Sequence, residues 1–139
     1  MSTKTIIYKG MLISDGLANF YKDLRDPDFL TQFTLYHRRY STNTLPRWSL
    51  AQPFRMIGHN GEINTFRGNI NWARSRDVQY ESEVLDEIIK DIIPVCNREV
   101  SDSAALDNMV ELYIRNGYSP SKALMLLLPE AYNNHPSIE

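Results

Sequence analysis

Three short stretches in the first half of the chain are rich in β-branched and large apolar residues, and each predicts a β-strand. They are residues 5–12, 33–40 and 54–59. The middle stretch alternates, so its side chains divide between two faces. One of these faces carries Phe33, Leu35, His37 and Arg39. The first half of the chain is therefore expected to supply the strands of a mixed fold.

Apolar residues spaced three or four positions apart predict five helices. These helices cover residues 14–25, 64–77, 84–93, 101–116 and 119–128. Ser14 stands where an N-cap is expected, and Ser119, which is followed by a proline, marks a second such start. Gly117 occupies the position of a C′ glycine, which ends a helix. Three strands, five helices and no internal repeat predict an α+β fold without a second domain.

The bulk composition narrows the classes of function. A chain of 139 residues with 42% apolar and 23% charged residues is typical of a soluble globular domain. The net charge of −2 argues against a nucleic-acid partner, and the longest apolar run is too short to cross a membrane. Cys96 is the only cysteine, which excludes an internal disulfide and favours a reducing compartment. We expect a protein of the cytoplasm or of an organelle interior such as the plastid.

Two polar stretches, residues 37–44 and 59–65, follow the short strand-like apolar runs 33–35 and 54–57. Polar residues just past a strand end are more often a binding site than a packing solution. The first stretch offers the guanidinium of Arg39 for a carboxylate. The second offers the amide of Asn60 and the N–H of Gly61, which suit a negative oxygen. Together they outline half of an acyl-transfer site, without an evident nucleophile.

Each of these residues also has an ordinary structural interpretation. On spacing alone, Arg39 is more often a solvated arginine. Asn60 and Gly61 form the favoured pair of a hairpin turn, although the residues after them do not alternate like a returning strand. Asp102 is first of all a helix-capping or first-turn acid, a role compatible with binding an ammonium group. These alternatives remain open on the residues alone.

Cys96 and the three histidines carry less chemistry. A free cysteine is usually a small buried hydrophobe, so a structural role is preferred for Cys96. His37, His59 and His135 lack the close spacing of metal ligands, and no metal site is expected.

Taken together, the motifs resemble the class II, N-terminal-nucleophile glutamine amidotransferase domain of the glutamate synthase large subunit. The matching stretches are residues 5–12, 37–48, 50–55, 59–69, 101–108 and 129–131. They are long, ordered and spread over nearly the whole chain, and so are more specific than a short fingerprint. The resemblance implies part of the αββα sandwich of N-terminal-nucleophile hydrolases.

The resemblance also implies roles for individual residues. Arg39 would bind the α-carboxylate of glutamine, with Thr42 as a neighbouring contact. Asn60 and Gly61 would form the oxyanion hole, Gly61 also contacting the substrate. Asp102 would bind the α-ammonium group. The family's nucleophile is an N-terminal cysteine, whereas this sequence starts Met-Ser-Thr, so the chain is expected to begin inside the domain.

Residues 1–139 are therefore predicted to be a partial amidotransferase domain that binds L-glutamine and is inactive alone. In the intact enzyme, by resemblance, the domain would supply ammonia for glutamate synthesis from 2-oxoglutarate. FMN, an iron-sulfur cluster and NAD(P)H or ferredoxin would serve other regions of that enzyme. The alternatives are a catalytically dead glutamine-binding or interaction module, half of a split enzyme completed by another chain, and an amidotransferase with a different ammonia acceptor.

Overall fold

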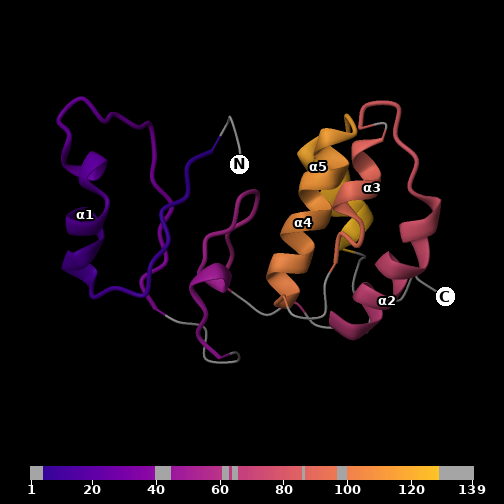
Figure 1. The fold of residues 1–139 in the computed structure, drawn as a ribbon, viewed down its shortest axis with the longest axis horizontal. Helices are drawn as coiled ribbons and strands as arrows, with labels where there is room; N and C mark the ends of the chain where they lie inside the picture. Colours follow the sequence, from indigo (N-terminus) through magenta and orange to yellow (C-terminus); the bar gives the residue numbers. More distant parts are fainter. Residues whose placement is uncertain are drawn as a thin grey trace, which may run out of the picture. The chain divides into compact units, whose positions relative to one another are not determined.

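The computed structural model describes residues 5–39, 45–60, 63, 66–85, 87–96 and 100–128. The chain divides into two compact units, Met1–Asn64 and Thr65–Glu139. Figure 1 shows that α1 belongs to the first unit and that α2 to α5 belong to the second.

The helical part of the first unit is broken into short turns. Its elements are the 3-10 turn η1 (Ser14–Gly16), α1 (Leu17–Phe20), η2 (Lys22–Arg25) and η3 (Trp48–Leu50). The single helix expected over residues 14–25 is wrong, because Tyr21 leaves the helical region with φ −99° and ψ 94°. The Tyr21 hydroxyl donates to the Lys9 carbonyl oxygen at 2.7 Å, and its ring packs edge-on against Tyr8 with centroids 4.8 Å apart. These contacts with the preceding segment hold Tyr21 out of the helix.

None of the described residues in the first unit lies in a β-strand, so the three predicted strands are not formed there. A strand needs a neighbouring strand to pair its backbone N–H and C=O groups. Residues 54–59 instead contain a tight reversal, in which the Phe54 N–H donates to the Ile57 carbonyl at 3.1 Å. The side chain of Leu35 packs closely against the backbone of Gly58, because a Cβ added to Gly58 would lie 2.5 Å from Leu35 Cδ2. The αββα sandwich is thus not seen in the described residues, and Tyr40 lies outside them.

Turns and exposed side-chain contacts hold the described part of the first unit, which contains no fully buried residue. Lys9 makes one such contact: its Nζ donates to the Ser49 carbonyl at 3.2 Å and lies 4.9 Å from the centre of the Phe54 ring. Large apolar side chains remain open to solvent, and Leu30 is 88% exposed and Phe33 81% exposed.

The second unit is helical. It contains α2 (Phe66–Arg76), η4 (Asp77–Gln79), α3 (Ile88–Ile92), α4 (Asp102–Arg115) and α5 (Pro120–Leu127). The helix predicted over 84–93 is shorter than expected, because Ser82 Oγ accepts the Leu85 N–H at 3.0 Å in a turn that precedes α3. The two C-terminal helices match their predictions closely. No helix in the described part of the chain is long and apolar enough to span a membrane.

Caps set the ends of α4 and α5. Ser101 Oγ accepts the Ala104 N–H at 3.2 Å, and Ser119 Oγ accepts the Lys122 N–H at 3.3 Å. Gly117 has a φ of +88°, the left-handed conformation in which a C′ glycine ends a helix. In contrast, Ser14 is the first residue of η1 rather than its cap, and that turn has no side-chain cap.

The core of the second unit joins α2, the segment before α4, and α4 itself. Its buried members are Ile70, Ala73, Cys96, Ala105 and Met109. Tyr80, Val95, Val100, Tyr113 and Leu127 pack against them. Of the stripe predicted on α4, Met109 and Val110 are buried, while Leu106 and Tyr113 are half-buried.

Candidate functional site

The structure places the predicted site residues in both units. Arg39 and Asn60 lie in the first unit, and Asp102 lies in the second. Thr42 and Gly61 lie outside the described residues. Each described site residue therefore has to be judged from its own surroundings.

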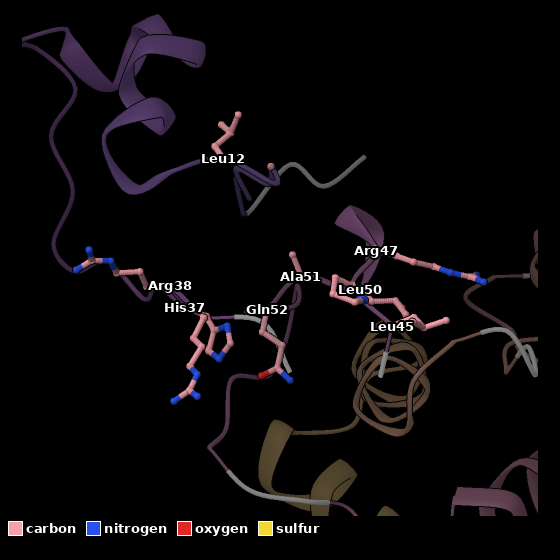
Figure 2. Close-up of a pocket in the computed structure, with 11 residues that line it drawn as sticks. Leu12, His37, Arg38, Leu45, Arg47, Leu50, Ala51 and Gln52 are labelled. Atoms are coloured by element: carbon pink, nitrogen blue, oxygen red, sulfur yellow. The ribbon is translucent and has the colours of Figure 1, made fainter. Parts of the chain in front are cut away.

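Arg39 lines a cavity of about 100 Å³ in the first unit. The walls come from residues 10 and 12, 37–39, 45–47 and 50–52. Figure 2 shows His37, Arg38 and Gln52 among these lining residues, with Arg47 on the opposite side of the view from His37 and Arg38. Three stretches that are separated in the sequence, residues 10–12, 37–39 and 45–52, thus contribute to one cavity.

The turn η3 and one hydrogen bond from a distant lysine position the cavity walls. Arg47 is the N-cap residue of η3 and has an extended backbone (φ −133°, ψ 137°). Leu50, the last residue of η3, lines the cavity. The bond from Lys9 Nζ to the Ser49 carbonyl ties η3 to the segment before Gly10. Gly10 and Leu12 therefore lie on the same cavity as Leu50.

The charges around this cavity are one-sided. Its described lining includes three arginines, Arg38, Arg39 and Arg47, together with His37 and Gln52, and it includes no Asp or Glu. Guanidinium groups pair with carboxylates through a planar fork of N–H donors. A guanidinium group at this cavity can bind an anionic group, and the role of Arg39 toward glutamine stays a prediction.

Asn60 is exposed in the first unit, and it is not among the described residues that line the Arg39 cavity. An oxyanion hole requires donors about 2.7–3.1 Å from the developing oxyanion. The partner donor expected from the sequence, the Gly61 N–H, lies outside the described residues. The oxyanion role of this pair stays a prediction.

Asp102 is the first residue of α4 and is half-buried. Its Oδ1 accepts the Ser103 backbone N–H at 2.6 Å and the Ser103 hydroxyl at 3.2 Å. A carboxylate in the first turn is also favoured by the positive end of the helix dipole. The first-turn interpretation of Asp102 is therefore confirmed, while binding of an ammonium group stays a prediction.

Cys96 is a core residue, as the sequence favoured. It is 2% exposed, and its thiol lies 3.8 Å from the Ala105 carbonyl oxygen. Burial and, as a smaller cause, the nearby Asp77 carboxylate together raise the pKa of the Cys96 thiol to about 11. A thiol in this state is a poor nucleophile because the thiolate is the reactive form.

A metal or cluster site finds no support in these residues. The described part of the chain has no group of three or more His, Cys, Asp or Glu residues that could hold a metal ion. An iron-sulfur cluster needs several cysteine thiolates, and the whole sequence contains one cysteine. The residues present do not fit such a cluster.

The sequence predictions missed part of the environment of these residues. The sequence assigned no role of their own to Arg38, Arg47 and Gln52, although the polar stretch 37–44 and the loop after it indicated this region.

Asp77 was also missed: its Oδ1 is buried and has no hydrogen-bond partner among the described residues. Burial raises the pKa of Asp77, against the lowering effects of Arg74 and of the Val95 N–H. No sequence pattern marked this half-buried acid.

Comparison with known families identifies the class of protein. The whole chain, residues 1–139, matches the class-II glutamine amidotransferases. The protein therefore belongs to this family.

Curated relatives narrow the similarity to one kind of enzyme. The chain is 55% identical over 138 residues to the chloroplastic ferredoxin-dependent glutamate synthase of Spinacia oleracea and 53% identical to that enzyme's isoform 2 from Arabidopsis thaliana. It is 49% identical over 139 residues to ferredoxin-dependent glutamate synthase 2 of Synechocystis. These matches cover 99% of this chain but only 8–9% of the relatives. The chain thus spans less than a tenth of their length.

Proposed function

We propose that this chain is the glutamine-binding part of an amidotransferase domain whose intact enzyme hydrolyses glutamine and passes ammonia to glutamate synthesis from 2-oxoglutarate. The observation that carries this proposal is the cavity around Arg39, whose described lining contains no Asp or Glu, in a member of the class-II family. A free amino acid has a carboxylate that such a cavity can bind.

The proposed roles are chemically complementary. Arg39 binds the α-carboxylate, Thr42 adds a contact to the substrate, and Asp102 binds the α-ammonium group. The carboxylate of Asp102 has more lone pairs than its two bonds to Ser103 use. Asn60 and Gly61 stabilise the tetrahedral oxyanion, a contribution worth on the order of a hundredfold or more in rate per donor.

We further propose that the 139-residue chain binds glutamine without hydrolysing it. The reaction that the family resemblance implies requires a cysteine thiolate, and Cys96 is buried with a pKa of about 11. An αββα sandwich would form when segments 5–12, 33–40 and 54–59 pair with other strands of the domain. Flavin and cluster chemistry, with ferredoxin or NAD(P)H as donor, is assigned to other regions of the intact enzyme. We place that enzyme in the cytoplasm or the plastid.

Calorimetric titration of the purified chain with L-glutamine, together with an assay for released ammonia, tests this function. We expect binding by the wild-type chain without ammonia release. Arg39→Gln should weaken binding about tenfold or more, since a hydrogen bond to a charged group contributes about 1.5–3 kcal/mol. Arg55→Gln, which changes an exposed arginine outside the Arg39 cavity, is the matched control.

Two results would count against the proposal. If the chain does not bind glutamine, or if the Arg39 and Arg55 variants weaken binding equally, there is no glutamine site at Arg39. Ammonia release by the wild-type chain would show that it is active alone.

A second candidate is half of a split enzyme that another polypeptide completes. The exposed apolar side chains of the first unit favour it, because its described residues include none that is fully buried. Co-purification of the tagged chain with a polypeptide that restores ammonia release would support this candidate. A dead glutamine-binding module would instead bind glutamine and recruit no such polypeptide.

A further inference from the structure

Two serines flank Asp102 at the start of α4, and they make different contacts. Ser101 is the helix cap, and its Oγ accepts the Ala104 N–H at 3.2 Å. Ser103 bonds the carboxylate itself: its backbone N–H lies 2.6 Å and its hydroxyl 3.2 Å from Asp102 Oδ1. Both donors of Ser103 therefore reach the same carboxylate oxygen.

Burial restricts the direction of the Ser103 hydroxyl. Ser103 is 3% exposed, whereas Asp102 is half-buried. A buried hydroxyl needs a hydrogen-bond partner within the protein, because water does not reach it. A carboxylate that is bonded at one oxygen by such a group favours one staggered rotamer. The other oxygen of Asp102, Oδ2, then points in a defined direction.

We propose that Ser103 is a positioning residue, which holds Oδ1 of Asp102 so that Oδ2 binds the α-ammonium group of glutamine. The role of Oδ2 rests on the proposed function, whereas the positioning of the carboxylate does not. A carboxylate that is already oriented loses less side-chain entropy when it binds a ligand. Ser103 acts through Asp102 and needs no contact with the ligand.

The two ends of glutamine should respond differently to a change at Ser103. Asp102 is assigned to the α-ammonium group and Arg39 to the α-carboxylate. Glutaramate, which is glutamine without its α-amino group, keeps the carboxylate and the side-chain amide. Loss of the Ser103 hydroxyl should therefore weaken the binding of glutamine and leave the binding of glutaramate unchanged.

Calorimetric titration of the purified chain with L-glutamine and with glutaramate tests this difference. The wild-type chain should bind glutamine about tenfold or more tightly than glutaramate, since the ammonium group bonds a charged acceptor. Ser103→Ala should weaken glutamine binding about three- to tenfold, the effect of one hydrogen bond, without changing glutaramate binding. Ser101→Ala, which removes the cap at the same helix end, is the matched control and should keep the preference for glutamine.

A second measurement observes Asp102 without any ligand. Three-bond couplings from Asp102 Cγ to its backbone N and C′, measured in the ¹³C,¹⁵N-labelled chain, report the side-chain rotamer. We expect one dominant rotamer in the wild-type chain and in Ser101→Ala, and averaging between rotamers in Ser103→Ala. Unchanged backbone signals from α5 report that each variant is folded.

Equal weakening of glutamine and glutaramate binding by Ser103→Ala would overturn the inference, because a merely structural role affects both ligands. The same Asp102 couplings in the wild-type chain and in Ser103→Ala would also overturn it. The outcome is separable from that of the proposed function. Couplings that respond to Ser103→Ala in a chain that does not bind glutamine support the positioning and contradict the glutamine site. Glutamine binding with unresponsive couplings does the reverse.

Discussion

At the scale of single residues, burial decides the chemistry of the Cys96 region. The thiol lies in the core of the second unit near the half-buried Asp77 carboxylate, and the pKa of each group is raised mainly by burial. The pKa of the half-buried Tyr80 is raised to about 12 by burial, with further contributions from Tyr113, Asp77 and Cys96. The sequence favoured a structural role for Cys96. It did not indicate the raised pKa of Asp77 or of Tyr80, because these shifts depend on burial by residues distant in the sequence.

The Cys96 pKa predicts how stability depends on pH. An unfolded thiol ionises near pH 9 and the folded one near 11, so the folded state binds more protons between these values. The free energy of unfolding should therefore fall as pH rises from 9 to 11, by up to about 1.4 kcal/mol per pH unit. Urea denaturation at pH 8, 9, 10 and 11 measures this slope. Cys96→Ala should remove the contribution of the thiol and keep the contribution of Tyr80, which appears at higher pH. If the variant has the same slope as the wild-type chain between pH 9 and 10, the slope does not come from Cys96.

At the scale of elements, the ends of α4 and α5 were readable from the sequence because caps are local. A serine before a helix, a proline at its first turn and a glycine just past its end each act within about four residues. The break at Tyr21 was not readable, since its hydroxyl and ring contact residues 8 and 9, more than ten positions away. The strand predictions failed for a related reason: a strand forms only with a pairing partner.

The caps predict measurable losses of stability. Ser119→Ala removes the acceptor of the Lys122 N–H and should lower the free energy of unfolding by about 1 kcal/mol. Gly117→Ala should cost about 1–2 kcal/mol because of its positive φ alone, since a Cβ there would meet no atom within 4 Å. Ser121→Ala, an exposed serine inside α5, is the matched control and should be neutral or slightly stabilising. Similar losses at positions 119 and 121 would show that the cap contributes nothing.

At the scale of the whole molecule, the two units should differ in local stability. The second unit has a buried apolar cluster and capped helices, whereas the described part of the first unit is joined by turns and surface contacts. Amide groups exchange slowly only where opening requires loss of such buried contacts.

Hydrogen exchange of the intact 139-residue chain checks this difference. We expect slow exchange in α4 and α5 and fast exchange over residues 5–39 and 45–60. Met109→Ala, which opens a cavity in the core, should speed exchange in the second unit and leave the first unchanged. Comparable protection of both units in the wild-type chain would contradict the contrast drawn from burial.

The sequence by itself determined what short-range physics can encode. Capping residues and a periodic apolar stripe defined α4 and α5, and the ordered motifs led to the class-II family and to the prediction that Arg39 binds an anion. Only the tertiary structure decided that Arg38, Arg47 and Gln52 share the cavity of Arg39, and that Cys96 is too buried to be a nucleophile. Both depend on which distant segments meet, because burial and the lining of a shared cavity are properties of packed neighbours and not of the order of residues in the sequence.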